Sequence, residues 1–151
     1  MMLRLPSLIV FAALVTVTAS FSAKFQPGAW YEQLTKPAWN PPDWVFAPVW
    51  TAIYIGIAAA GWLTWRRTQR LEPALVVWML QLAANGLWSW LFFGLHEPGI
   101  ALLDIVVLFG LIVGFIVLAR RHSAAASWLF APYALWVAFA ASLNAAIWRA
   151  N

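Results

Sequence analysis

The chain has 151 residues, of which 64% are hydrophobic and only 9% are charged, and its mean hydropathy is +0.79. A soluble domain is roughly 45–50% apolar and about 25% charged, and disordered chains are poor in apolar residues, so the composition excludes both classes. Because the chain has no cysteine, it cannot hold a disulfide, a thiolate zinc site, an iron–sulfur cluster or covalently attached haem. Its nine basic residues are dispersed and form no phosphate-binding stripe. We therefore expect an integral membrane protein whose surroundings are the lipid bilayer and which binds no nucleic acid.

Apolar stretches long enough to cross a bilayer, which takes about 20 helical residues, occur five times. They cover residues 5–23, 46–65, 74–94, 99–119 and 128–148. Membrane β-strands alternate in polarity, whereas these runs are continuous. The sequence predicts an all-α membrane protein with a single domain over residues 1–151: a five-transmembrane-helix bundle with a long first loop over residues 24–45.

The first span has two interpretations. Met1 to Arg4, an apolar run and the small residues around Ala19–Ala23 together resemble a secretory signal peptide. The apolar run is longer than the roughly 7–15 residues usual in such peptides, which favours a retained helix.

The basic residues indicate the orientation. One side of the membrane carries six of them and the other carries Lys24, Lys36 and Arg149. The six are Arg4, Arg66, Arg67, Arg70, Arg120 and Arg121. Because basic loops stay in the cytoplasm, we expect a cytoplasmic N-terminus. A helical bundle favours the bacterial inner membrane, with an outer or organelle membrane left open.

The first loop is rich in proline and tryptophan. Prolines at positions 27, 37, 41 and 42 remove backbone donors and favour extended conformations, so we expect a stiff, non-helical segment. It also carries Trp30, Tyr31, Trp39 and Trp44. Irregular backbone is not tolerated in contact with lipid, so the loop must lie over the mouth of the bundle. It is either a lid over a ligand pocket or a structural plug and interface anchor.

The later spans carry polar and aromatic residues at helical spacing. In the third span they lie on one face, as Trp78, Gln81, Asn85, Trp88 and Phe92. Trp50 and Tyr54 share a face in the second span, and the fifth span carries Tyr133, Trp136, Ala140 and Asn144. These stripes either line a pocket or join helices through amides, which bind across membrane interfaces.

Small residues repeat every fourth position at Ala52-Gly56-Ala60, at Gly110 and Gly114, and at Ala134-Ala138-Ser142-Ala146. Such rows allow close helix packing, and one of them could form a dimer contact. Asp104 lies about a turn into the fourth span. We interpret it as a charge favoured by the helix dipole rather than as a proton relay, which needs partners at depth.

Enzyme motifs are absent from the sequence, which has no thiol nucleophile, HExxH motif or phosphate loop. His96 and His122 fall in predicted loops, so no histidine is expected to bind a haem iron in the core. We expect no metal site and no required cofactor.

Several segments resemble the TspO/MBR family, which includes the tryptophan-rich sensory proteins, the translocator protein and the peripheral-type benzodiazepine receptor. The resemblance covers nearly the whole chain. It rests on Trp30-Tyr31, on residues 36–46 (KPAWNPPDWVF), on Pro48-Val49-Trp50-Thr51 with Tyr54, on residues 81–89 (QLAANGLWS), on residues 132–136 (PYALW) and on residues 143–149 (LNAAIWR).

The resemblance implies a bundle, usually dimeric, that binds porphyrins such as protoporphyrin IX and haem, benzodiazepine- and isoquinoline-type drugs, and in some members sterols. By position, it implies a pocket lined by Trp30, Tyr31, Trp39, Trp50, Tyr54, Asn85, Trp88, Trp136, Phe139 and Ala140. The family's sterol pattern requires a tyrosine between Leu143 and Arg149, where this chain has Ala145, which argues against sterol as a ligand.

Three functions remain in competition. The first is a tetrapyrrole-binding membrane protein. The second is a light-dependent porphyrin-degrading enzyme in which Trp30 and Trp136 are the catalytic residues, as the resemblance implies for some bacterial members. The third is a porphyrin or sterol transporter, against which the absence of an acidic relay and of broken helices argues.

Overall fold

The computed structural model describes the backbone of residues 4–151 and the side chains of residues 5–151. The first three residues, which contributed to the signal-peptide comparison, lie outside the described residues, as does the side chain of Arg4. Five helical segments are long and apolar enough to cross a membrane, as predicted. The protein is an all-α integral membrane protein.

The helices follow one another with short connections. In chain order they are α1 (Arg4–Ser22), α2 (Ala29–Gln33), the 3-10 turn η1 (Asp43–Val45), α3 (Phe46–Thr68), α4 (Pro73–Ser89), the π-helical turn η2 (Trp90–Gly94), α5 (Pro98–Ala119), α6 (Ala124–Leu129) and α7 (Ala131–Ala150). Thus η1 extends the second span, η2 extends the third, and α6 with α7 forms the fifth.

Prolines set several of these boundaries. α4 begins at Pro73 and α5 at Pro98, where a missing N–H costs nothing because the first helical turn has no intrahelical acceptors. Pro132 lies in the first turn of α7 and has no N–H to bond back to Trp128. The fifth span therefore breaks at Phe130, between α6 and α7.

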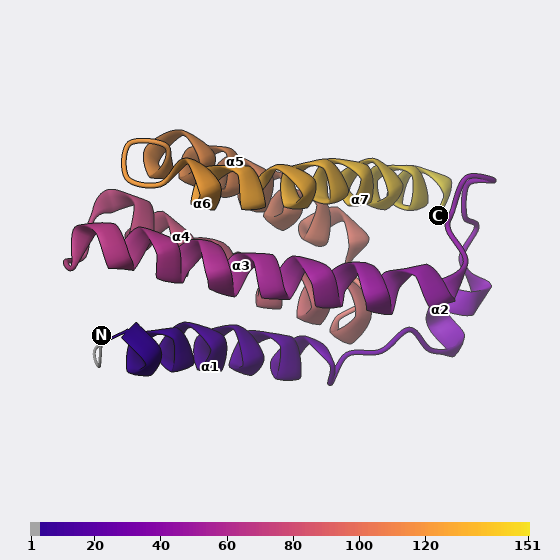
Figure 1. Ribbon diagram of the computed structural model, residues 1–151. Helices are drawn as coiled ribbons and strands as arrows, with labels where there is room; N and C mark the ends of the chain where they lie inside the picture. Colours follow the sequence, from indigo (N-terminus) through magenta and orange to yellow (C-terminus); the bar gives the residue numbers. More distant parts are fainter. Residues whose placement is uncertain (1–3) are drawn as a thin grey trace.

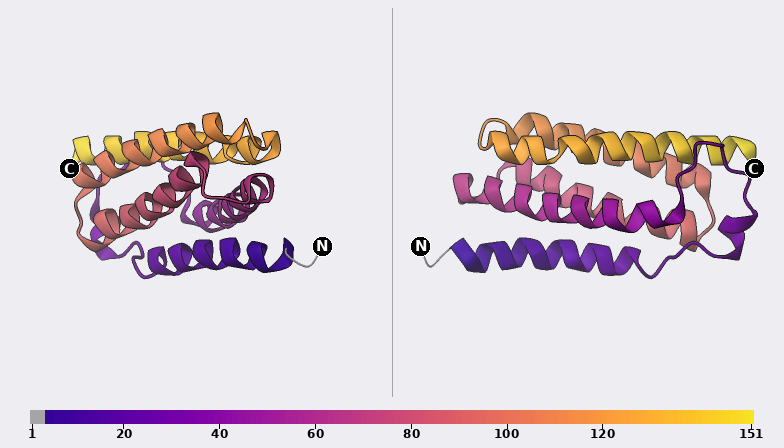
Figure 2. Two further views of the ribbon diagram at one scale, coloured as in Figure 1. Left: turned by 90° about the vertical axis from the view of Figure 1, so that its left-hand side faces the viewer. Right: turned by 45° about the vertical axis from the view of Figure 1, so that its right-hand side comes forward.

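The bundle has distinct sides and ends. α1 lies along one side and packs on α3 and α4, while α5 packs between α4 and α7. The chain starts at one end of the bundle, and the first loop, with α2, lies at the opposite end beside the end of α7 (Figures 1 and 2). Outward-facing side chains such as Leu5, Leu103 and Val107 are apolar and exposed, as a lipid-facing surface requires.

The expectation of a non-helical first loop is wrong for two segments, because α2 and η1 are helical turns. The reason is the placement of the prolines. None occurs between Gly28 and Thr35, so backbone donors are available there, and Glu32 N–H donates to the Gly28 carbonyl at 3.1 Å. The remaining stretch between α2 and η1 is irregular, as expected.

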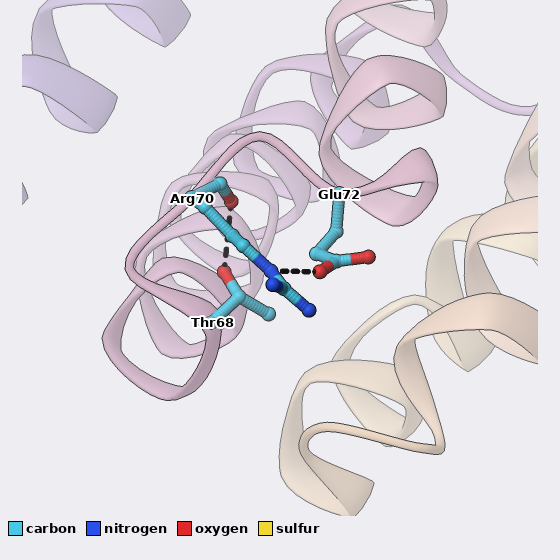
Figure 3. A network of polar contacts seen from close by, with 3 residues as sticks. All are labelled: Thr68, Arg70 and Glu72. Carbon is cyan, nitrogen blue, oxygen red and sulfur yellow. Dashed lines mark hydrogen bonds and ion pairs between the residues drawn. The ribbon is translucent and has the colours of Figure 1, made fainter.

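The turn between α3 and α4 is polar and lies at the chain-start end. Gln69 adopts a left-handed conformation, with φ of 54°, that ends α3. Beyond it, the Thr68 hydroxyl donates to the Arg70 carbonyl at 3.0 Å and Arg70 pairs with Glu72 (Figure 3). These contacts fix a short turn, which directs α4 back through the membrane beside α3.

Glycines of two small-residue rows face other helices of the bundle. A Cβ on Gly56 would lie 3.6 Å from the Leu129 carbonyl oxygen, so the Ala52-Gly56-Ala60 row lets α6 approach α3. A Cβ on Gly114 would lie 3.7 Å from Val77, whereas the position on Gly110 is open.

Trp78 is the centre of the packing between α1, α3 and α4. Its side chain has no exposed surface, and its indole N–H donates to the Ile57 carbonyl at 2.9 Å. Phe11 of α1 meets the indole edge-on at 5.0 Å. The indole fits because Gly61 has no side chain: a Cβ there would lie 2.5 Å from Trp78 and 2.7 Å from Phe11.

Gly61→Ala is therefore expected to destabilise the bundle, because the added methyl group must displace two packed rings. Overpacking of this kind typically costs about 1–3 kcal/mol. Thermal unfolding of the purified protein in detergent measures the effect. Gly110→Ala, whose new methyl group meets open space, is the matched control: it gains the same helix propensity without a clash, so it should not lower the midpoint. Equal midpoints for the two variants would contradict this packing.

Candidate functional site

A cavity of about 640 Å³ opens at the first-loop end of the bundle. Its walls come from the end of α1, the start of α3, α4 with η2, and the facing parts of α5 and α7. This volume lies within the roughly 300–1,000 Å³ typical of small-molecule pockets. The lining is mainly aromatic and aliphatic, and Asp43 is the charged residue in it.

Most of the residues predicted for the pocket line this cavity. They come from segments far apart in the sequence, which the bundle brings together. They are Tyr31, Trp50, Tyr54, Asn85, Trp88, Trp136 and Ala140.

Three predicted residues lie beside the cavity rather than in its lining. Trp30 stacks on His96 with ring centres 4.3 Å apart and planes 8° from parallel. Phe139 packs between Trp136 (5.5 Å) and Trp39 (5.6 Å), and Trp39 is 49% exposed. These rings therefore support the walls and the loop instead of facing the cavity.

A chain of hydrogen bonds joins α3, α4 and α7 beneath the cavity. The Tyr54 hydroxyl donates to Asn85 Oδ1 at 3.1 Å, and Asn85 Nδ2 donates to the Tyr133 hydroxyl at 2.7 Å. Tyr133 in turn donates to Gln81 Oε1 at 2.8 Å. Asn85, Tyr133 and Gln81 are all buried. Asn85 thus joins helices and also lines the cavity, two roles that the sequence presents as alternatives.

A second polar link closes the opposite wall. The Trp88 indole N–H donates to Asn144 Oδ1 at 2.9 Å, and Asn144 Nδ2 donates to the Pro98 carbonyl at 2.8 Å. The Pro98 carbonyl is at the start of α5, so this link ties α4, α5 and α7 together. The Trp88 ring stacks on Phe92 at 5.0 Å, and the link therefore fixes an aromatic surface.

The indole N–H of Trp136, unlike that of Trp88, makes no hydrogen bond among the described residues. It lies edge-on to Trp50 at 6.5 Å and to Phe46 at 5.8 Å. Within the described part of the chain its buried indole nitrogen has no hydrogen-bond partner. The cavity thus offers aromatic faces, and an unsatisfied indole N–H lies buried in its wall.

The first loop is fastened over this end of the bundle. The backbone N–H of Thr35 donates to Asn151 Oδ1, and Asn151 Nδ2 donates to the Thr35 carbonyl, both at 3.0 Å. Lys36 Nζ lies 4.5 Å from the centre of the Tyr31 ring, within cation–π range. Burial raises the pKa of Tyr31 above its ordinary value, so this phenol stays neutral at physiological pH.

Sequence reasoning missed several lining residues. The end of α1 contributes Ala19 and Ser22, the residue after it is Ala23, and α5 contributes Ile105 and Leu108. Small and aliphatic residues carry no signal that separates a cavity wall from a packed core. Phe46 and Phe93 also line the cavity. Phe46 could have been found, since it lies one helical turn before Trp50.

Among residues 5–151, no group of three histidine, aspartate or glutamate side chains lies close enough to hold a metal ion. His96 stacks on Trp30 outside the cavity lining. The arrangement can therefore hold a flat apolar molecule by stacking and by a few hydrogen bonds.

Tyr133→Phe is expected to lower stability, because it leaves the buried Asn85 Nδ2 and Gln81 Oε1 atoms without partners. An unsatisfied buried polar group costs about 1–3 kcal/mol. Thermal unfolding in detergent reports the loss, and Trp128→Phe, at a site that is 76% exposed, is the control. An unchanged midpoint for Tyr133→Phe would show that the chain of hydrogen bonds contributes nothing.

Asn151→Ala is expected to release the first loop without unfolding the bundle, because both bonds to Thr35 are lost. Hydrogen exchange followed by mass spectrometry should show faster exchange over residues 29–45 and unchanged exchange in α4 and α5. Asn151→Asp keeps the acceptor and loses the donor, so its exchange should be intermediate. Uniform exchange in all three proteins would mean that the loop is held elsewhere.

Comparisons with known proteins agree with this architecture. The model of the TspO/MBR family matches residues 7–149. The tryptophan-rich protein TspO of Chlorobaculum tepidum is 42% identical over 131 residues, covering 83% of this chain and 82% of the relative. Protein CrtK of Rhodobacter capsulatus is 35% identical over 151 residues (96% and 94%), and the human translocator protein is 36% identical over 126 residues (81% and 75%). The chain belongs to the TspO/MBR family.

Proposed function

We propose that the protein binds a flat tetrapyrrole such as protoporphyrin IX or haem in the cavity at the first-loop end. The observation that carries this proposal is the lining itself. Trp50, Trp88 and Trp136 present aromatic surface, while Tyr54 and Asn85 add polar atoms. Extensive apolar contact with few placed polar groups is typical of small-molecule sites, and a macrocycle offers large faces for stacking.

Binding without degradation is the role the geometry favours. The degrading enzyme requires both Trp30 and Trp136 to act on the porphyrin. Trp136 lines the cavity, whereas Trp30 stacks on His96 outside the lining. A bound porphyrin would therefore contact only one of the two indoles.

Transport receives support from names alone, since relatives are called translocator protein. In the five spans, α4 ends in a π-helical turn and a short break precedes α7, but no inverted pair of broken helices occurs among the described residues. Many transporter folds carry such a pair of broken helices, so we favour binding over transport.

Benzodiazepine- and isoquinoline-type molecules fit the same proposal, since fused aromatic rings can stack on the same walls. Sterol fits less well, because Ala145 on α7 supplies no ring between Leu143 and Arg149. Sequence patterns for sterol binding are weak guides, so this argument carries little weight.

The orientation and assembly are also proposals. The α3–α4 turn and the end of α5 lie at the chain-start end of the bundle, and the first loop and the end of α7 lie at the opposite end (Figure 1). By their places in the chain, the first group carries Arg66, Arg67, Arg70, Arg120 and Arg121, and the second carries Lys24, Lys36 and Arg149. By the positive-inside rule we propose that the chain start lies in the cytoplasm and the cavity mouth outside. A helical bundle favours a bacterial inner membrane, with an outer or organelle membrane left open. We propose a homodimer that forms through one of the small-residue rows.

Trp136→Ala is expected to weaken protoporphyrin IX binding at least tenfold, because it removes a stacking surface, and about 1.4 kcal/mol corresponds to tenfold. Titration of the protein in nanodiscs in the dark, followed by tryptophan quenching, gives the dissociation constant. Trp128→Ala is the matched control, since it removes an exposed indole on α6. Equal affinities for Trp136→Ala and the parent would contradict the proposed site.

Illumination of the same complex separates binding from degradation. Binding alone predicts that the porphyrin absorption decays no faster with the protein than in empty nanodiscs. A faster decay with a new absorbing product, abolished by Trp30→Phe, would transfer the assignment to the enzyme.

A further inference from the structure

A second hollow lies on the outside of the bundle, between α1 and α3, which run side by side (Figure 1). Its volume is about 460 Å³, and we call it the α1–α3 groove. α1 contributes small residues such as Ala12, Thr16 and Ser20 to its lining, and α3 contributes residues that include Ile55 and Ala58. Ile55 is 67% exposed. The groove therefore faces the lipid.

The packing of α1 leaves room for this groove. Near the chain start, the Trp62 indole N–H of α3 donates to the Ser7 hydroxyl at 3.2 Å. Farther along, α1 rests on α4, because a Cβ on Gly86 would lie 3.6 Å from Thr18 and 3.4 Å from Phe21. α1 is thus held against α3 near its beginning and against α4 near its end. The space between α1 and α3 stays open toward the first loop.

The groove and the cavity share a wall. Four residues line both hollows: Ala19, Ala23, Thr51 and Tyr54. Three of the four have small side chains, and the hydroxyl of the fourth, Tyr54, is bonded to Asn85 of the cavity. A single layer of side chains therefore separates the cavity from the lipid-facing surface.

The groove presents apolar surface to its occupant. The hydroxyl of Thr16 donates to the Ala12 carbonyl and that of Thr51 donates to the Ala47 carbonyl, both at 2.8 Å. Because these donors are satisfied within their own helices, methyl groups and aliphatic chains remain for contact. An apolar ligand that crosses this surface keeps apolar surroundings throughout, and it avoids the unfavourable transfer into water.

The route from the aqueous side is covered by the first loop. Two hydrogen bonds join Asn151 to Thr35, and Trp30 of α2 stacks on His96. A ligand that arrived from this side would have to leave the lipid and then pass the loop. The groove requires neither step.

We propose that the α1–α3 groove is a lateral entrance, through which a fused-ring aromatic ligand dissolved in the lipid reaches the cavity without passing through water. The shared wall is the observation that carries this proposal. Because the entrance serves the cavity, it rests on the proposed function, and it adds the source of the ligand and its route. It also restricts the ligand class to molecules that partition into the bilayer.

Ser20→Phe is expected to slow entry and exit alike. Ser20 lines the groove and not the cavity, and a helical side chain leans over the turn before it, so the added ring covers the groove beside Thr16 and Ala19. Stopped-flow tryptophan quenching by protoporphyrin IX, in nanodiscs and in the dark, gives both rate constants. Each should fall by about fivefold or more, which takes only about 1 kcal/mol of added barrier, while the dissociation constant stays at the parent value.

Two further variants control this measurement. Val17→Phe adds a ring to the same helix at a position that is 68% exposed and lines neither hollow, so it should keep the parent rates. Asn151→Ala releases the first loop and should not speed association, because a ligand from the lipid does not pass the loop. If Ser20→Phe fails to fold, Ile55→Trp fills the groove from α3.

Two results would overturn the entrance. Faster association in Asn151→Ala, together with parent rates in Ser20→Phe, would show that the ligand enters from the aqueous side. A raised dissociation constant in Ser20→Phe with an unchanged association rate would show that the groove is part of the binding site and not a route to it.

A second test needs no porphyrin. In deuterated protein with protonated alanine methyl groups, nuclear Overhauser contacts between lipid acyl chains and the Ala19 methyl group report whether the groove admits molecules from the bilayer. We expect these contacts in the parent and in Val17→Phe, and we expect Ser20→Phe to lose them. Their absence in the parent would mean that a second copy of the chain or another segment covers the groove, which would contradict the proposal.

The two tests separate the entrance from the proposed function. If protoporphyrin IX does not bind but the Ala19 contacts appear and are lost in Ser20→Phe, the proposed function fails and the opening to the bilayer stands. If protoporphyrin IX binds with the same rates in the parent and in Ser20→Phe, the proposed function stands and the entrance fails.

Discussion

The structure depends on satisfying polar side chains inside a bilayer. Lipid offers no hydrogen bonds, so each buried amide or hydroxyl must find a partner on a neighbouring helix. Asn85 does this twice, by accepting from Tyr54 on α3 and donating to Tyr133 on α7. The same residue lines the cavity. The bonds that set the helix positions therefore also fix the polar atoms that a ligand would meet.

The rest of the bundle supports that network from its two ends. At the chain-start end, Trp78 fills the space left by Gly61 and locks α3 to α4. At the other end, Asn144 joins Trp88 to the start of α5, and Asn151 holds the first loop at Thr35. These bonds hold the walls of the cavity in place, so a flat molecule can bind with little rearrangement. The conformational entropy of ordering the site is then lost on folding rather than on binding, which favours affinity.

The sequence was sufficient for the spans and for the polar face of α4, because both follow from strong periodic signals. Trp78, Gln81, Asn85 and Phe92 are all buried on that face. The sequence could not place Trp30, because stacking on His96 depends on a left-handed turn at position 96, with φ of 57°, after the π-helical turn. Nor could it assign α1 to the cavity wall, since Ala19 and Ala23 are small residues whose side depends on tertiary packing. The short helix α2 was not predicted, because the prolines on either side of it favour extended backbone.

The most direct measurement is a set of nuclear Overhauser contacts between bound protoporphyrin IX and methyl-labelled protein in nanodiscs. The account predicts contacts from the macrocycle protons to the methyl groups of Ala140, Ile105 and Leu108, which line the cavity. Leu103 and Val107, on the exposed face of the same helix α5, should show none. Contacts confined to Leu103 and Val107 would place the porphyrin on the lipid-facing surface and contradict the account.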